Sequence, residues 1–265
     1  MREVAALALE NFRVHATFPS HEIPEARVEE SRALTWVDSG LDTDTFNIAL
    51  GARLDAGSVR RRAAEVIAHF ERAARPFSWW VSPGDEPEDL GDRLAAEGLA
   101  PEAWELAMSC PLDRLRPAPP ASGLEIQRVA TREALAAFAR LSAENWTPAD
   151  RLVERYYARA AERLLGTGSP LRFYLARREG TAVAAVEIAA SAIALGVYNL
   201  STRLEHRNAG VGGALLSEAL RSQRAETGAA LAVLQAAPAA SSLYRRLGFE
   251  EFGRIAEFKP GRSVR

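Results

Sequence analysis

The sequence predicts an α/β (α+β) protein built from two parts. Short apolar or alternating segments, typical of strands, are interleaved along the chain with longer segments of helical periodicity. A proline-rich stretch near the middle divides these segments into two groups of related order. With 265 residues, of which 48% are hydrophobic, the chain is long enough to bury a sizeable core.

The composition limits the classes of partner. Charged residues make up 26% of the chain and the formal net charge is −2, whereas proteins that bind nucleic acid or anionic lipid usually have a basic excess. No segment stays apolar over the roughly 18 residues that a membrane span needs. Acidic Glu3 and Glu10 flank the short apolar run at the N-terminus, and no small-residue cleavage site follows it. We expect a cytoplasmic protein with no nucleic-acid or membrane partner, either a monomer with an internal pseudo-dimer or a homodimer.

The clearest boundary is the segment 116–123, which contains three prolines, a serine and a glycine. This composition favours an extended linker. We expect residues 1–115 and 124–265 to form two domains of ordinary size. The single cysteine, Cys110, has no partner for an internal disulfide and is expected to be a buried thiol at the end of a strand.

The elements of the second part follow from periodicity and turn signals. A glycine-containing turn at 178–181 joins two predicted strands. Gly228 is the expected C-cap of the predicted helix that begins at residue 211. The predicted strands are 124–129, 172–177, 182–189, 193–202, 231–236 and 249–258. The predicted helices are 131–143, 151–165, 211–228 and 239–247.

The first part repeats the later half of that order. Its predicted strands are 46–54, 77–81 and 104–109. One predicted helix begins at residue 59, after the expected N-cap Ser58, and a second predicted helix spans 89–97. Gly98 and Gly248 each follow a predicted helix, and we interpret the repeat as a diverged internal duplication. The tryptophans expected in the core of this part are Trp79, Trp80 and Trp104.

One segment between a predicted strand and a predicted helix suits a pyrophosphate. It reads Arg207-Asn208-Ala209-Gly210-Val211-Gly212-Gly213-Ala214. Glycine lets backbone N–H groups approach an anion closely, and a helix N-terminus adds partial positive charge. The dinucleotide fingerprint would need Gly in place of Leu215, and a Walker loop would need Lys after the glycines. The remaining pattern is Arg-x-x-Gly-x-Gly.

That pattern resembles the acyl-CoA pyrophosphate motif of the GNAT superfamily of acetyltransferases. A later segment, Ala240-Ser241-Ser242-Leu243-Tyr244-Arg245-Arg246-Leu247-Gly248-Phe249, resembles the superfamily's A-x-x-L-Y-x-x-x-G-F signature. The resemblance covers residues 124–260, including the order of elements. It implies a mixed, mostly antiparallel sheet flanked by helices, acetyl-CoA as co-substrate without a metal, and direct transfer of the acetyl group to a primary amine of a small molecule or peptide.

The resemblance also implies roles for individual residues. A splayed strand would hold the pantetheine arm through the backbone of Leu200, Ser201 and Thr202. A backbone N–H of Thr202 or Leu200 would stabilise the oxyanion, and Tyr244 would protonate the departing thiolate. The residues that would wrap the pyrophosphate are Arg207, Asn208, Ala209, Gly210, Val211, Gly212, Gly213 and Ala214.

Two departures from the superfamily pattern leave assignments open. The superfamily often has Asn where this chain has Ala237, so one hydrogen bond to the cofactor is either missing or made by Ser241 or Ser242. The predicted strand 193–202 carries no carboxylate, so the general base is unknown.

The candidate bases are Glu187 and Glu144, although each also fits an ordinary solvated carboxylate, and ordered water could deprotonate a solvated amine instead. Either acceptor binding or ordinary packing fits four residues near the first two helices: Asn145, Trp146, Tyr156 and Tyr157. His15, His21 and His69 show no metal-ligand spacing and are expected in structural or solvent-exposed roles.

The first part has no Arg-x-x-Gly-x-Gly pattern. Only residues 55–58 separate its predicted strand from its helix, which is too short to wrap a pyrophosphate. We expect it to lack a cofactor site and to cover the catalytic domain or shape the acceptor pocket. The alternative function is a catalytically silent acyl-CoA-binding regulator or scaffold, motivated by Ala237 and the missing strand carboxylate. An aminoacyl transferase using charged tRNA is disfavoured by the intact glycine segment and the net charge.

Overall fold

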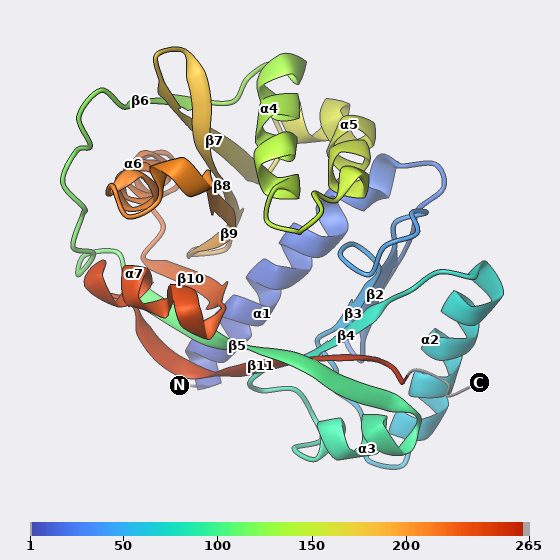
Figure 1. Ribbon diagram of the computed structural model, residues 1–265. Helices are drawn as coiled ribbons and strands as arrows, with labels where there is room; N and C mark the ends of the chain where they lie inside the picture. The colour runs from blue at the N-terminus through green and yellow to red at the C-terminus, as the bar shows by residue number, and fades with distance from the viewer. Residues whose placement is uncertain (1, 262–265) are drawn as a thin grey trace.

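The computed structural model describes residues 2–261 and contains one sheet of 11 strands with helices on both faces (Figure 1). The strand order is β1-β2-β3-β4-β11-β5-β10-β9-β8-β7-β6. The pairs β3–β4 and β9–β10 are parallel, and the other neighbours in residues 2–261 are antiparallel. The predicted α+β class with a mixed, mostly antiparallel sheet is confirmed.

The first part of the chain provides α1 (Arg2–Thr17), a 3-10 turn (Phe18–Glu22), β1 (Arg27–Glu30), β2 (Thr35–Asp38), β3 (Ile48–Leu50), α2 (Val59–Ala73), β4 (Ser78–Val81), α3 (Leu90–Ala96) and β5 (Leu99–Pro111). The second part provides β6 (Glu125–Arg128), α4 (Arg132–Ala143), α5 (Arg151–Leu165), β7 (Leu171–Arg178), β8 (Thr181–Ser191), β9 (Ala194–Thr202), α6 (Val211–Thr227), β10 (Leu231–Ala236), α7 (Ser241–Arg246) and β11 (Glu250–Pro260), with 3-10 turns at Leu204–His206 and Pro238–Ala240. The predicted elements are present, most of them with ends shifted by a few residues. Helix α1 and strands β1 and β2 were not predicted.

The last strand of each part lies beside the other part. Strand β5 pairs with β10, β11 pairs with β4, and β5 and β11 pair with each other at the centre of the sheet (Figure 1). The order β3-α2-β4-α3-β5 therefore repeats as β9-α6-β10-α7-β11 with exchanged final strands. Gly98 and Gly248 occupy equivalent places after α3 and α7, with left-handed φ values of 89° and 98°. This topology supports the internal duplication, and independent folding of the two parts stays a prediction.

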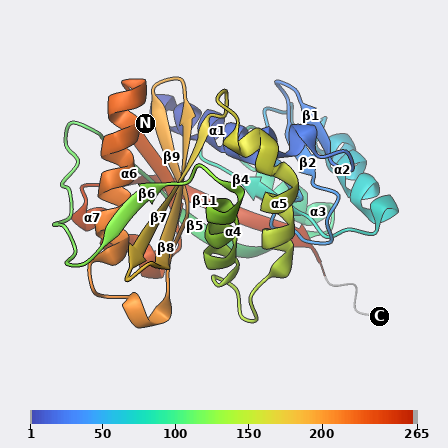
Figure 2. The ribbon, with the colours of Figure 1, turned by 90° about the horizontal axis from the view of Figure 1, so that it is seen from above.

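The second part of the sheet is covered on both faces (Figure 2). Side chains alternate between the faces along β7, so Tyr174 and Ala176 join the cluster under α6, while Phe173 and Leu175 join the cluster under α4 and α5. Helix α1 lies against β8 and β9, in the second part, although it opens the first. Its buried positions Leu9, Phe12 and Ala16 follow a helical spacing, which explains why this segment is a helix.

The linker 116–123 packs along α6. The backbone N–H of Ala118 donates to Ser217 Oγ at 2.9 Å, and a Cβ on Gly213 would lie 3.1 Å from the Cβ of Ala118. Cys110 is buried at the end of β5, as predicted. Within residues 2–261, none of the helices has both the length and the apolarity that crossing a membrane requires.

The tryptophan prediction was partly wrong. Trp79 is fully buried and Trp80 is half-buried, but Trp104 is 44% exposed. The reason is that β10 pairs with β5 only over 106–111, so Trp104 lies beyond the end of β10. Its ring contacts the guanidinium of Arg254, which lies 4.5 Å from the ring centroid.

Candidate functional site

The parallel pair β9–β10 opens into a V. Its pairing runs from Ala194 opposite Leu231 to Val197 opposite Leu234 and stops there. Strand β9 nevertheless continues to Thr202, and β10 continues to Ala236 alongside β5. The backbone edge of β9 over 198–202 is therefore not paired with β10, and it can accept an extended ligand as a strand would.

A β-bulge accompanies this opening. Between the pairs Glu187–Tyr198 and Ala185–Ser201, β9 contains one residue more than β8. Asn199 lies in the bulge with φ 52°, a left-handed conformation that Asn tolerates better than most residues. The bulge breaks the strict alternation of β9 at the point where the two strands separate.

The loop 203–210 leads from β9 to α6, and its glycine-rich end is exposed. Asn208 is left-handed, with φ 59°. Arg207 donates from Nε to the carbonyl of Thr202 at 2.9 Å, which holds its guanidinium beside the end of β9. The loop therefore places a cation next to the open strand edge.

The start of α6 presents free donors. Gly210 is the N-cap with φ 75°, and the first helical hydrogen bond runs from Ala214 N–H to Gly210 C=O at 3.0 Å. In the described part of the chain, this leaves three N–H groups of the first turn without a backbone partner: Val211, Gly212 and Gly213. A Cβ on Gly210 would meet no atom within 4 Å, so the space in front of the helix is open. These features fit an anion.

A cleft opens at the mouth of the V, and we name it the β9–β10 cleft. The second part contributes Asn199, Leu200, Gln235, Ala236, Ala237 and Tyr244 to its lining. The first part contributes Phe12, His15, Asp44, Phe46, Trp80 and Glu105. Glu257 and Lys259 of β11 complete it, together with Asn145 and Trp146 from the loop between α4 and α5. Tyr156 and Tyr157, in contrast, are buried in the packing of α5.

Tyr244 is 8% exposed on α7 and lines the cleft. Burial, with the nearby charge of Glu105, raises the pKa of its hydroxyl to about 12. Its ring packs edge-on against Phe249 at 6.0 Å, and within residues 2–261 its hydroxyl makes no hydrogen bond. A protonated phenol with no internal acceptor is available to donate a proton into the cleft.

Glu187 is not a solvated carboxylate; it is 1% exposed on β8. Its oxygens accept hydrogen bonds from the Tyr157 hydroxyl at 2.9 Å and from the Asn199 amide at 3.1 Å, and Oε1 lies 2.7 Å from Nδ1 of His15. The reason for the error is α1, which covers β8 and was not predicted. Burial, followed by the charge of Glu187, raises the pKa of Tyr157 well above its usual range.

His15 was also missed as a residue of the site. Its ring stacks on Tyr198 with centroids 3.8 Å apart and planes 2° from parallel, and it lines the cleft. The Tyr198 hydroxyl donates to Asn11 Oδ1 at 3.0 Å, and Asn11 donates to the carbonyl of Ala189 at 2.9 Å. These contacts anchor α1 to β8 and β9. His15 and Glu187 are too far apart in sequence for any spacing rule to connect them, and the helical stripe of α1 was the signal that was available.

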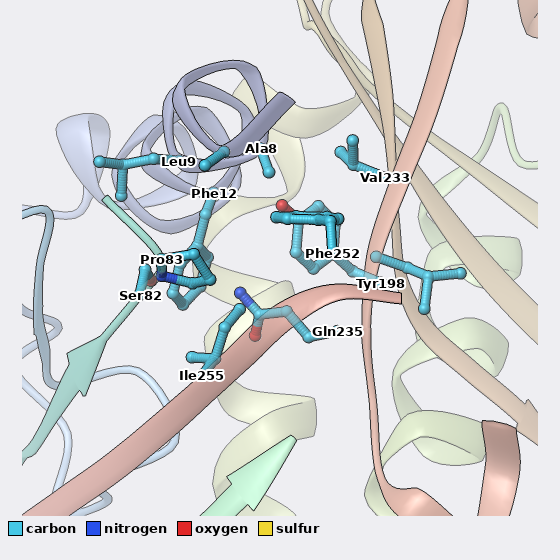
Figure 3. A pocket seen from close by; sticks show the side chains of 12 residues that line it. Ala8, Leu9, Phe12, Ser82, Pro83, Tyr198, Val233, Gln235, Phe252 and Ile255 are labelled. Atoms are coloured by element: carbon cyan, nitrogen blue, oxygen red, sulfur yellow. The ribbon is translucent and has the colours of Figure 1, made fainter. Parts of the chain in front are cut away.

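Side chains of α1 and the sheet also enclose a small apolar pocket (Figure 3). Its labelled lining residues are Ala8, Leu9, Phe12, Ser82, Pro83, Tyr198, Val233, Gln235, Phe252 and Ile255. Among the residues that the structure describes, no charged side chain lines this pocket, so it offers packing contacts between the two parts and no chemistry.

The remaining predicted residues lie away from the cleft or offer little to it. Glu144 is exposed, pairs with Arg203 at 3.5 Å and does not line the cleft. Ala237 lines the cleft without an amide to offer. The Ser241 hydroxyl donates to the carbonyl of Pro238 at 2.7 Å, whereas Ser242 is exposed.

The first part contains a closed counterpart of the glycine loop. Strand β3 ends at Leu50, so residues 51–58 join it to α2 and match the length of loop 203–210. The expectation that this loop is too short was therefore wrong. Its space is instead filled by Arg13, whose Nη2 donates to the carbonyl of Gly51 at 2.9 Å and would lie 2.7 Å from a Cβ there.

Acidic groups gather at the end of the cleft near Tyr244. Burial, with the charge of Glu257, raises the pKa of Glu105 to about 7. Lys259 lies 3.0 Å from Asp44 and 3.3 Å from Glu257, and so neutralises part of this charge. Among residues 2–261, no group of three or more His, Cys, Asp or Glu side chains could hold a metal ion.

Comparisons with known proteins agree with this architecture. Residues 169–251 match the family described as "Acetyltransferase (GNAT) domain". No curated protein matches the sequence. Three solved structures share the fold across both parts: a GCN5-related N-acetyltransferase from Kribbella flavida (18% identity, TM-score 0.74, 97% of each chain covered), a functionally unknown conserved protein from Staphylococcus epidermidis (13%, 0.62, 94% of this chain and 99% of that one), and a tandem GNAT protein from the clavulanic acid biosynthesis pathway (17%, 0.59, 91% and 85%).

Proposed function

Because residues 169–251 form an acetyltransferase domain of the GNAT superfamily, we propose that the protein transfers an acetyl group from acetyl-CoA to a primary amine. The observation that carries this proposal is a juxtaposition in the second part of the chain. The opened pair β9–β10 and the hydroxyl-bearing Tyr244 line one cleft. The exposed glycine-rich start of α6 lies at the end of β9, where a Cβ on Gly212 would be 3.2 Å from Thr202 Oγ1. Each suits a different portion of an acyl-CoA.

The backbone would hold most of the co-substrate. Leu200, Ser201 and Thr202 would pair with the pantetheine arm along the open edge of β9. Arg207 and the N–H groups at the start of α6 would hold the pyrophosphate, and the open space in front of Gly210 supports this fit. A backbone N–H of Leu200 or Thr202 would stabilise the oxyanion, a donor typically worth roughly 3 kcal/mol.

Acetyl-CoA supplies a reactive thioester, and the chain supplies the proton that its thiol group needs on leaving. Tyr244 is the donor that the cleft offers, because it is protonated at neutral pH and its hydroxyl has no internal acceptor among the described residues. A positioned general acid of this kind contributes about 10²–10⁴ in rate.

The cleft favours a cationic acceptor. Asp44, Glu105 and Glu257 line the end that the first part of the chain helps to build, and Lys259 offsets only part of their charge. The ring of Trp80 lines the same space, and aromatic faces attract ammonium groups. This lining supports primary amines that carry positive charge over acidic or neutral peptides.

A panel of primary amines tests the function through CoA thiol release at saturating acetyl-CoA. We expect release with cationic primary amines and none with tertiary amines of the same charge, because the free base of a tertiary amine has no N–H to lose after it attacks. Calorimetric binding of acetyl-CoA without release from any amine would contradict acetyl transfer. It would support the alternative, a catalytically silent acyl-CoA-binding regulator, which the missing amide at Ala237 favours.

A further inference from the structure

We propose that His15, oriented by Glu187, is the general base that takes the proton from the acceptor amine. The first part of the chain then contributes a catalytic group to the site of the second part. This inference rests on the acetyl transfer proposed above and assigns the base that the sequence left unknown.

The His15–Glu187 contact sets which ring nitrogen is free. Nδ1 of His15 lies 2.7 Å from Oε1 of Glu187. A carboxylate only accepts hydrogen bonds, so in the neutral imidazole Nδ1 carries the proton and Nε2 carries the lone pair. Within residues 2–261, Nε2 makes no hydrogen bond. The side chain of His15 is 21% exposed and lines the same cleft as Leu200 and Tyr244.

The base is also held in one orientation. Its ring stacks on Tyr198 at 3.8 Å, so it is fixed on one face by an aromatic plane. Glu187 is held in turn by Tyr157 and Asn199, which satisfy its second oxygen. A carboxylate that is 1% exposed is costly unless such donors surround it, and Tyr157 and Asn199 fix the carboxylate that in turn fixes the histidine.

The other charged groups near the cleft are less suited to this role. Glu187 is the carboxylate that faces His15, but it is itself buried and does not line the cleft. The remaining charged groups of the lining are Asp44, Glu105, Glu257 and Lys259, of which all but Glu105 pair with one another. Glu105 acts through its charge on Tyr244, the proposed acid, whose pKa burial and that charge raise.

Every bond and proton of the transfer step can be accounted for with His15, Tyr244 and solvent. The acceptor attacks as its free base, with one proton already lost to solvent: its nitrogen forms a bond to the carbonyl carbon, the C–S bond breaks, and the electron pair of that bond stays on sulfur. One N–H proton of the amine moves to Nε2 of His15, and the thiolate takes the proton of Tyr244. Solvent then carries a proton from His15 to Tyr244, so both residues return to their starting states.

The test compares two half-buried histidines, each of which faces a buried carboxylate. His15→Gln should lower kcat by about 10²–10⁴, the range for loss of a general base, with calorimetric affinity for acetyl-CoA unchanged. The matched control is His69→Gln, because His69 Nε2 lies 2.9 Å from the buried Asp38 outside the cleft. Its kcat should stay within about threefold of wild type, far less than loss of a base costs.

Three further readouts separate a base from a structural residue. The acid limb of the kcat–pH profile, where the wild-type base is protonated, should disappear in His15→Gln. His15→Ala leaves a space between Tyr198 and Glu187, and added imidazole should restore its rate in a concentration-dependent way. Glu187→Gln should lower kcat without abolishing it, since the histidine remains but loses its orienting carboxylate.

A folded His15→Gln variant with kcat near wild type, or with the acid limb intact, would overturn the assignment. Failure of imidazole to rescue a folded His15→Ala variant would count against it in the same way. If the wild-type protein itself releases no thiol with any amine, the proposed function fails first. If the wild-type protein is active and replacing His15 leaves its turnover unchanged, only the assignment of His15 as the base is refuted.

Discussion

Tyr244 and Glu105 line the same cleft, and the charge of Glu105 acts on the protonation of Tyr244. The charge of Glu105 contributes to the raised pKa of Tyr244, and burial with the charge of Glu257 raises the pKa of Glu105 to about 7. The tyrosine therefore stays protonated throughout the neutral range, while the carboxyl changes charge within it. The two residues call for different tests.

Replacement of Tyr244 by Phe removes the hydroxyl and keeps the ring. We expect kcat to fall by roughly 10²–10⁴, with acetyl-CoA affinity close to wild type, because sulfur gains charge only as the C–S bond breaks. The control is Tyr174→Phe, whose hydroxyl bonds Ser222 and Gln223 under α6, away from the cleft. A Tyr244→Phe enzyme within about threefold of wild type would remove this residue from the mechanism.

Replacement of Glu105 by Gln should change the pH dependence of stability. An ordinary glutamate carboxyl has a pKa of 4.5, and in the folded protein the pKa of Glu105 is raised to about 7, so the folded state binds more protons between these values. Its contribution to stability is present below pH 4.5 and is lost as the pH rises through 7. At pH 8 we expect the free energy of unfolding of Glu105→Gln to exceed that of wild type by an amount on the order of 1–3 kcal/mol. The variant should therefore melt at a higher temperature at pH 8 and lose this advantage near pH 4. Equal melting curves at pH 8 would contradict it.

At the scale of elements, α6 carries a matched pair of glycines at its two ends. Gly210 at the N-terminus has φ 75°, Gly228 at the C-terminus has φ 71°, and a Cβ on either would meet no atom within 4 Å. Ala at either position should cost roughly 1–2 kcal/mol of folding free energy for the left-handed backbone. Only Gly210→Ala adds a methyl group where the pyrophosphate would bind.

The measurement is calorimetric affinity for acetyl-CoA in both variants. We expect Gly210→Ala to weaken binding at least tenfold, about 1.4 kcal/mol, and Gly228→Ala to leave it unchanged. Equal affinities in the two variants would place the pyrophosphate elsewhere.

The sequence predicted those elements whose signals are local. The helix 151–165 and the strand 231–236 match α5 and β10 residue for residue, because a stripe or an apolar run bounded by caps and turns defines each. The segment 207–214 and Tyr244 were named from motifs of consecutive residues. By contrast, the short strands β1 and β2 have too few residues for a periodicity to emerge.

The cleft was harder to predict because its parts meet only in the folded chain. His15 reaches Glu187 through the packing of α1 on β8, and Trp104 is exposed because β10 ends before it. Neither fact has a local signal. The loop 51–58 was misjudged for a related reason, since its strand ends at Leu50 and its space is filled by Arg13 from another helix.

At the scale of the whole molecule, the exchange of β5 and β11 couples the two parts. Phe258, on the last strand of the chain, belongs to the core cluster of the first part and is 7% exposed. We expect Phe258→Ala to destabilise the protein by about 3–5 kcal/mol and to shift one common unfolding transition. Four of the five tryptophans lie in residues 1–115, so fluorescence reports chiefly on that part, while circular dichroism reports on all helices.

Urea unfolding followed by both signals should give coincident curves in wild type and variant. Two separated transitions, with Phe258→Ala shifting the fluorescence curve alone, would show that the parts unfold independently despite the shared sheet.

Helix α1 makes different contacts with the two related halves of the chain. From neighbouring positions of this one helix, Arg13 fills the loop of the first half, and His15 reaches the cleft of the second. In a symmetric homodimer every mutation enters both subunits, so a side chain that blocks one binding loop would block its twin. A fused pair has no such constraint, because different codons encode the two halves. A mutation can therefore block the binding loop of one half while the loop of the other half stays open. Fusion therefore lets selection convert a half whose binding loop is redundant into part of the wall of the cleft that the other half keeps open.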